Sequence, residues 1–178
     1  MNYFEFYNLP QSFQLDEAAL RRTFLERSRQ YHPDFHTLSD EAEQGRMLEL
    51  STINNEAFKT LSDLDKRIQY ILKINGLLEE GENQGALSQD FLMEMMDINE
   101  AMMELEFDFD AERYKQARHA VEALDQTLLK EIQPVLNNWT AEAENPAELL
   151  QVREYFFKKR YLLRIFENLS KFAAASES

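Results

Sequence analysis

Apolar residues recur every three or four positions along nearly the whole chain, which is the period of an amphipathic α-helix. The clearest early case runs from Asp16 to Tyr31, where one face is formed by Leu20, Phe24, Ser28 and Tyr31. An Asp at the start of such a run is a favoured N-cap, because its carboxylate accepts an N–H of the first turn. We therefore expect a helix over these residues.

The same pattern predicts further helices over 39–61 and 63–75, and a short one over 2–9 that ends at Pro10. Gly76 is well placed as the left-handed cap of the 63–75 helix. In the longest of these segments the expected core stripe is Met47, Leu50, Ile53 or Asn54, Ala57 and Leu61.

The tetrapeptide Tyr31-His32-Pro33-Asp34 separates the first two long helices. Pro33 has no N–H and biases His32 away from the helical region, so the first helix ends at Tyr31. The turn therefore holds a His and an Asp at the tip of a helical hairpin.

The helix that leads into this turn carries Arg21, Arg22 and Arg29 on its outer face, although the chain has a net charge of −14. Such charges usually belong to a solvated face. Beside an exposed turn they also fit contact with an acidic protein surface. Both interpretations stay open on the pattern alone.

Residues 77–87 include two of the four glycines and three acidic residues. We interpret them as a linker between a first domain, 1–76, and a second, 88–178. Beyond the linker, apolar stripes joined by short connections predict a bundle of three helices. Pro134 falls inside the second stripe, where the helix should kink or break. The third stripe is expected to pack through Leu149, Val152, Phe156, Leu163, Phe166 and Leu169.

The first segment of this bundle has more apolar residues than one core face needs. At about 100° per residue, the expected core side is formed by Phe91, Met95, Ile98, Met102 and Leu105. A second group points away from it, formed by Leu92, Met93, Met96 and Met103 among the acids Asp97, Glu100 and Glu104. Flexible thioethers beside carboxylates suit a locally basic protein partner, whereas packing against the first domain is the alternative.

Composition narrows the class of protein. The chain is 44% hydrophobic with only 4 Gly and 4 Pro, which favours an all-α fold. It has no Cys, so disulfides and thiolate metal sites are excluded, and its acidity argues against binding nucleic acid. No apolar run of about 18 residues exists to span a membrane, and the N-terminus has no secretory pattern, so we expect a cytoplasmic protein.

An enzyme is the alternative from another class. His32 and His36 with Asp34 suggest a metal site, but Pro33 prevents the helical spacing of a zincin and no general-base motif accompanies them. Helix capping accounts better than calcium binding for the acids around Asp108. We therefore expect no catalytic residue, no bound metal and no cofactor.

The N-terminal region resembles the J-domain. The resemblance rests on Tyr31 before His32-Pro33-Asp34, on the basic helix that leads into the triplet, and on Ile53-Asn54, Ala57-Phe58 and Leu61 after it. It implies that Arg21, Arg22, Arg29, His32, Pro33 and Asp34 contact an ATP-driven chaperone of the DnaK/HscA type. Phe35 departs from the pattern, since many J-domains have Lys there.

A J-domain followed by a three-helix bundle is the layout of the HscB-type iron-sulfur cluster co-chaperones of bacterial type, and Phe91-Leu92-Met93-Glu94 is similar to the start of their scaffold-binding helix. The resemblance implies that an IscU-type scaffold protein is bound by Leu92, Met93, Met96, Asp97, Glu100, Glu104 and Phe157. Phe157 lies beside the core stripe, as an exposed anchor would; packing at the bundle edge is the alternative.

The expected function is therefore delivery of the scaffold to the chaperone, with stimulation of the chaperone's ATPase through the His-Pro-Asp triplet. The alternative is a J-domain co-chaperone that uses the same bundle face for a different protein client.

Overall fold

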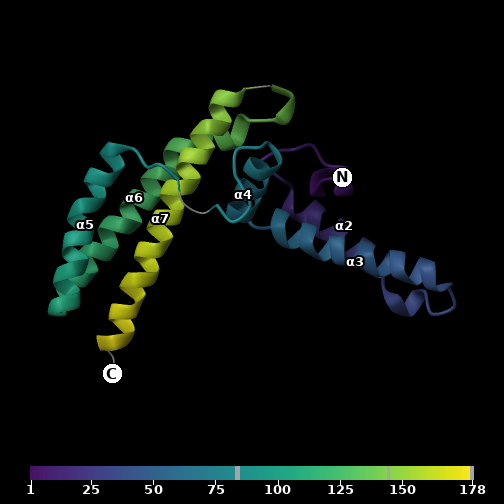
Figure 1. Ribbon diagram of the computed structural model, residues 1–178, viewed down its shortest axis with the longest axis horizontal. Coiled ribbons are helices and arrows are strands. Elements are labelled where there is room, and N and C mark those ends of the chain that lie inside the picture. The colour runs from purple at the N-terminus through teal and green to yellow at the C-terminus, as the bar shows by residue number, and fades with distance from the viewer. Residues whose placement is uncertain (83–84, 144, 177–178) are drawn as a thin grey trace. The chain divides into compact units, whose positions relative to one another are not determined.

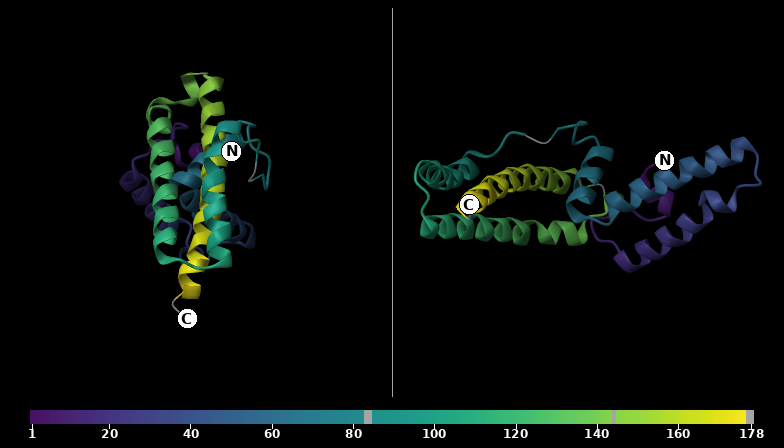
Figure 2. Two further views of the ribbon diagram at one scale, coloured as in Figure 1. Left: turned by 90° about the vertical axis from the view of Figure 1, so that its left-hand side faces the viewer. Right: turned by 90° about the horizontal axis from the view of Figure 1, so that it is seen from below.

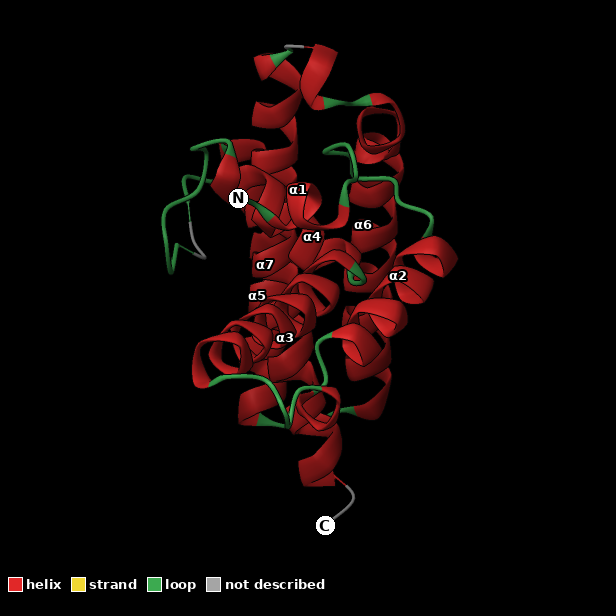
Figure 3. Cartoon of the chain, turned by 90° about the vertical axis from the view of Figure 1, so that its right-hand side faces the viewer, coloured by secondary structure: helices red, strands yellow, loops and turns green. Residues whose placement is uncertain are grey.

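The computed structural model describes residues 1–82, 85–143 and 145–176. Within these ranges the regular elements are helices, with a single isolated bridge between Ser12 and Thr140, and Figure 3 shows helices joined by loops. The all-α prediction is confirmed. By compactness the chain divides into two units, one formed by Met1–Leu77 with Leu136–Pro146 and the other by Leu78–Val135 with Ala147–Ser178.

The first unit is built on a helical hairpin, visible in Figure 1 as α2 and α3. Asp16 caps α2 as expected, because its carboxylate accepts the N–H of Ala19 at 2.9 Å. Gly76, with a φ of +72°, provides the predicted left-handed residue after the fourth helix. The elements are α1 (Tyr3–Tyr7), α2 (Glu17–Gln30), the 3-10 helix η1 (Pro33–Phe35), α3 (Glu41–Leu61) and α4 (Leu64–Ile74).

Asn54, a buried amide of α3, joins the first three α-helices. The Tyr7 hydroxyl of α1 donates to its Oδ1 at 2.7 Å. Its Nδ2 donates to the carbonyl of Phe24 at 3.2 Å and to the hydroxyl of Ser28 at 3.1 Å, both on α2. Asn54 is 1% exposed whereas Ile53 is half-buried, so the choice left open for the core stripe falls on Asn54. A buried amide is tolerated here because its polar atoms have partners.

Arg67, a buried cation of α4, ties the loop before α2 to the end of α3. Its Nε donates to the carbonyl of Leu61 at 2.7 Å, and its Nη1 donates to the carbonyl of Phe13 at 2.6 Å. The Phe13 ring is fully buried and lies 5.0 Å from the Trp139 ring, between centroids. The segment 136–146 thus completes the core of the first unit, although it lies far along the chain.

The second unit is a bundle in which α5, α6 and α7 run side by side, as Figures 1 and 2 show. Ser88 caps the first of them, accepting the N–H of Phe91 at 3.3 Å. The elements are α5 (Gln89–Phe107), α6 (Ala111–Asn138), the 3-10 helix η2 (Ala141–Ala143) and α7 (Pro146–Ser176). Buried residues of the α5 and α6 core include Phe91, Met95, Ile98, Leu105, Val121, Leu128 and Ile132.

Two details of the bundle bear on the expectations from the sequence. Of the kink or break expected at Pro134, the break is absent, because the second helix continues to Asn138; apolar residues on both sides of the proline, Ile132 and Leu136, are buried. In α7 the buried face carries Leu162 and Ile165, whereas the expected Leu163 and Phe166 are half-buried. Positions one residue apart differ by only about 100° around a helix, so neighbouring helices decide between them.

Candidate functional site

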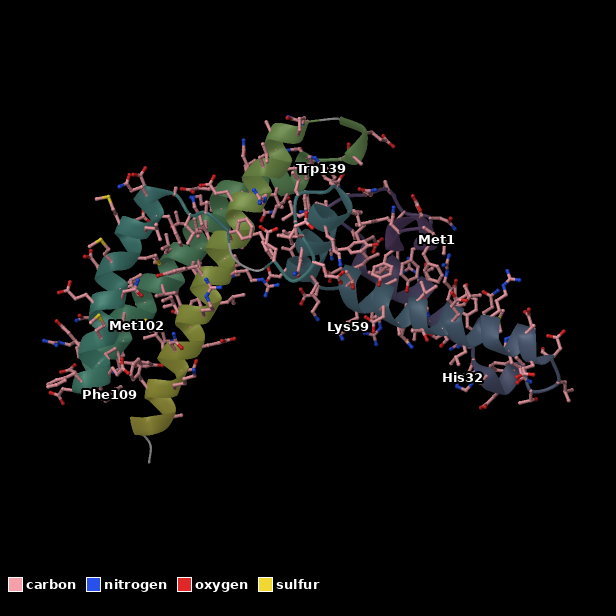
Figure 4. The ribbon with its side chains drawn as sticks, in the orientation of Figure 1. Met1, His32, Lys59, Met102, Phe109 and Trp139 are labelled. Atoms are coloured by element: carbon pink, nitrogen blue, oxygen red, sulfur yellow. The ribbon has the colours of Figure 1, made fainter. Side chains whose placement is uncertain are left out.

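The His-Pro-Asp loop, residues 32–34, is the turn at the tip of the hairpin, where Figure 4 places His32. The backbone N–H of Asp34 donates to His32 Nδ1 at 3.2 Å, and the Asp34 carboxylate lies 3.6 Å from the same nitrogen. His36 Nε2 donates to the carbonyl of Gln30 at 2.7 Å, which ties the far side of the turn to α2. Local hydrogen bonds therefore hold the turn while its three side chains are exposed.

The side chains of this loop are exposed and largely polar. Within residues 1–82, 85–143 and 145–176 no group of three His, Asp or Glu side chains is arranged to hold a metal ion. His32 and Asp34 instead present a ring nitrogen and a carboxylate to solvent on a turn that Pro33 stiffens. Such an arrangement can bind a partner's polar groups with little loss of conformational freedom.

The basic face of α2 is formed by Arg21, Arg22 and Arg29, all exposed. Over the part of the chain that the structure describes, none of the three has an ion-pair partner. Arg29 lies in the last turn before the loop, whereas Arg21 and Arg22 lie about 10–12 Å further back along the helix. Arg27 has a different role, because its guanidinium lies over the Phe6 ring, 4.5 Å from the centroid.

The second candidate surface is the α5 face, formed by Leu92, Met93, Met96, Asp97, Glu100 and Glu104. The side chains of Leu92, Met93 and Met96 are 44%, 62% and 66% exposed. At about 100° per residue, the centre of this face is roughly opposite the line of buried residues through Met95 and Ile98. The predicted division of this helix is confirmed for Phe91, Met95, Ile98 and Leu105, which are buried, whereas Met102, expected in the core, is half-buried.

The carboxylates of the α5 face have different surroundings. Glu104 accepts a hydrogen bond from Arg113 Nη1 at 2.7 Å, so part of its charge is neutralised within the bundle. Asp97 and Glu100 are exposed and make no ion pair in the described residues. These two charges are available to a basic partner, and they would mainly speed and orient its approach.

Phe157 does not have the exposure expected of it. Its side chain is 4% exposed and packs edge-on against Phe156, with ring centroids 5.5 Å apart. The Arg153 guanidinium lies over the ring at 5.1 Å, and Gly85 approaches it so closely that a Cβ there would lie 2.6 Å from two ring atoms. The expectation of an exposed anchor is wrong, because the segment before α5 returns to cover this part of α7. Phe157 is thus not part of the exposed α5 face in this structure.

Sequence reasoning also missed exposed apolar residues near the loop. Phe35 and Leu38 are 73% and 101% exposed, and Leu25 is exposed among the arginines of α2. The signal was available in part, since Phe35 stands where a J-domain often has Lys. An apolar residue in a turn is readily assumed to pack against the rest of the protein, but Phe35 and Leu38 are exposed here.

The likeness to known proteins covers almost the whole chain. A protein of Aeromonas hydrophila, named Co-chaperone protein HscB homolog, is 30% identical over 173 residues, which are 97% of this chain and 96% of that protein. The chain belongs to the HscB co-chaperone family. An HscB homolog of Vibrio campbellii is 32% identical over 85% of this chain and 97% of its own length. The family model for the HSCB C-terminal oligomerisation domain matches residues 87–170.

Solved HscB structures have the same fold. The crystal structure of human co-chaperone protein HscB matches with a TM-score of 0.73 and 26% identity, over 96% of this chain and 81% of that one. Chaperone HscB from Vibrio cholerae matches with a TM-score of 0.65 over 97% of this chain and 99% of that one. The first hairpin is therefore a J-domain and the bundle is the C-terminal helical domain of an HscB protein.

HscB proteins are co-chaperones, a non-enzymatic family whose members act with a chaperone. None of the described helices is both long and apolar enough to span a bilayer. The family assignment is compatible with the exposed His-Pro-Asp loop of one compact unit and the exposed α5 face of the other.

Proposed function

We propose that this protein binds an IscU-type iron-sulfur scaffold through the α5 face and delivers it to a DnaK/HscA-type chaperone, whose ATPase it stimulates through the His-Pro-Asp loop. The function served is iron-sulfur cluster assembly and transfer. The observation that supports it most is the α5 face itself, where Leu92, Met93 and Met96 are exposed beside the unpaired carboxylates of Asp97 and Glu100. A bundle surface that binds no partner would not need three large apolar side chains in solvent.

The chaperone contact is assigned to the J-domain. Asp34 and His32 offer hydrogen-bonding groups on a turn held by its own backbone contacts, while the basic face of α2 attracts an acidic chaperone surface. Hydrolysis takes place in the chaperone, and this chain contributes binding energy alone. It accelerates the reaction by binding the hydrolysis-competent state of the chaperone more tightly than the resting state.

Delivery of the scaffold to the chaperone then follows from thermodynamic linkage between the binding of the scaffold and the binding of the J-domain. If the scaffold and the J-domain both favour the same state of the chaperone, each increases the other's apparent affinity by an equal factor. A coupling of roughly 1–3 kcal/mol would give a 5–150-fold effect. This protein raises the coupling further because it holds both activities in one chain and so increases their effective concentration.

The test measures ATP hydrolysis by the chaperone with this protein alone, with the scaffold alone and with both. The expected result is stimulation by the protein and a larger stimulation by the pair. Asp34→Asn should reduce stimulation to the basal rate while scaffold affinity stays unchanged. Glu56→Gln, which neutralises an exposed carboxylate of α3 outside the loop, is the matched control.

The scaffold site is tested separately with the double variant Leu92→Ser and Met96→Ser. Truncating two exposed apolar contacts should weaken scaffold binding at least tenfold, or about 1.4 kcal/mol, and remove the synergy while leaving stimulation by this protein alone intact. Phe157 is left unchanged, since it is buried. Stimulation that the scaffold never enhances would refute the scaffold assignment and favour a J-domain co-chaperone with a different client.

A further inference from the structure

The exposed apolar side of α5 continues well beyond the α5 face. Met103 and Phe107 are 71% and 96% exposed, and they fall in line with Leu92 and Met96 at spacings of four, seven and four residues. At about 100° per residue these four side chains lie within roughly 60° of one another around the helix. The row spans about 22 Å along the axis, with Leu92 and Met96 forming its proximal half and Met103 and Phe107 its distal half.

A hollow lies beside the distal half of this row. It has a volume of about 760 Å³ and is formed between α5 and the C-terminal part of α7. Met102 and Met103 contribute from α5, while Asn168 and Phe172 contribute from α7. Figure 4 shows Met102 on α5. Met103 belongs both to the row and to the hollow, so the two features form one continuous surface.

The charges of this region select a basic partner. Between residues 90 and 110 the sequence has eight Asp and Glu residues and no Lys or Arg. By helical angle, Glu100 and Glu104 lie on the side of the row away from Met102, and Glu104 is paired with Arg113. The hollow on the other side is lined by Glu106 of α5 and Lys171 of α7 as well as by Met102. A partner must therefore offer apolar side chains in line, with cationic groups on the side of Glu100, and at the hollow it meets one carboxylate and one ammonium group.

We propose that the scaffold-docking surface extends over the full length of α5, with a second anchor at its distal end. There Met103 and Phe107 contact the scaffold, and an apolar side chain of the scaffold enters the hollow beside Met102 and Phe172. The proposal rests on the proposed function, because continuity with the α5 face and the shared carboxylate flank identify the same scaffold as the occupant. Exposed thioether and aromatic side chains suit such an anchor, since they bury large area without a polar penalty.

The experiment is calorimetric titration of the IscU-type scaffold into full-length variants. Phe107→Ser and Met103→Ser should each weaken binding by about tenfold, the effect expected of an anchor residue. Asn168→Trp should also weaken it, because an indole placed at an exposed position of α7 fills the hollow without altering the row. All three positions are at the surface, and circular dichroism confirms that each variant is folded.

Leu150→Ser is the matched control, because Leu150 is 53% exposed on α7 and belongs to neither the row nor the hollow. Its affinity should equal that of the unmodified protein. Unchanged affinity in Phe107→Ser and Met103→Ser, with a clear loss in the Leu92 and Met96 double variant, would overturn the distal anchor and leave the proposed function standing. Equal losses in Leu150→Ser and Phe107→Ser would also overturn it. No binding by the unmodified protein would refute the proposed function itself.

Discussion

Replacing Phe157 with Ala is expected to lower the free energy of unfolding of the bundle by about 3–5 kcal/mol, the cost of truncating a buried Phe. The ring is 4% exposed, and it loses its edge contact with Phe156 and its cation-π contact with Arg153. Those two contacts add roughly 0.5–1.5 and 0.5–1 kcal/mol to the loss of burial, which puts the expected cost in the upper half of the range. Domains are commonly stable by only 5–15 kcal/mol, so the change would be large.

Urea unfolding followed by circular dichroism at 222 nm measures the effect on both compact units. The fluorescence of Trp139 reports on the first unit, to which that residue belongs, so a loss confined to the bundle should move the dichroism transition more than the fluorescence transition. Phe109→Ala is the control, since Phe109 is 39% exposed and its truncation should cost much less. An unfolding midpoint that does not move in Phe157→Ala, with scaffold affinity sharply reduced, would refute this reasoning and restore Phe157 as an exposed anchor.

Three further predictions concern stability, and urea unfolding measures each. Gly85→Ala should destabilise the protein by about 1–3 kcal/mol, because the added Cβ overlaps with the Phe157 ring. Gly45→Ala, in an open helical position, should instead stabilise it by about 0.5–1 kcal/mol. Equal effects of the two changes would contradict the close approach of Gly85 to Phe157. Arg67→Met removes hydrogen bonds to two backbone carbonyls and leaves both acceptors without this partner, so it should cost about 3–5 kcal/mol, measured by the tryptophan fluorescence. An unchanged free energy of unfolding would show that these bonds contribute nothing. Burial raises the pKa of Tyr7 to about 12. The contribution of the neutral hydroxyl to the free energy of unfolding, on the order of 2–3 kcal/mol, is therefore complete below pH 10 and is lost as pH rises toward 12. Tyr7→Phe should flatten this dependence of stability on pH, and an unchanged slope would refute the assignment.

Helix positions and the two-sided character of α5 could be predicted because they depend on local chemistry. Asp16, Asp63 and Ser88 each cap the helix that follows them, through a hydrogen bond to an N–H of its first turn. The second apolar group on α5, with Leu92, Met96 and Met103, was visible because one helix cannot bury residues on opposite faces in a bundle of three; Phe107 was not expected in it. The pattern left open whether the second apolar group binds a partner or packs against the first domain.

The burial of Phe157 could not be predicted, because it depends on a segment that returns from elsewhere. A glycine at position 85 allows that segment to approach α7, and nothing in the local pattern of α7 indicates it. The shift of the buried face to Leu162 and Ile165 has a similar origin, since over a helix as long as α7 small angular errors accumulate. The grouping of residues 136–146 with the first unit likewise depends on long-range contacts.

That last grouping has a consequence for how the chain acquires its structure. Phe13 is fully buried partly against Trp139, so the N-terminal unit needs residues that a ribosome adds more than a hundred positions later. A fragment that ends at residue 77 would leave the Phe13 ring without its aromatic neighbour. The J-domain of this protein therefore reaches its final packing only after most of the chain has been synthesised, which opposes the usual order in which N-terminal domains fold first.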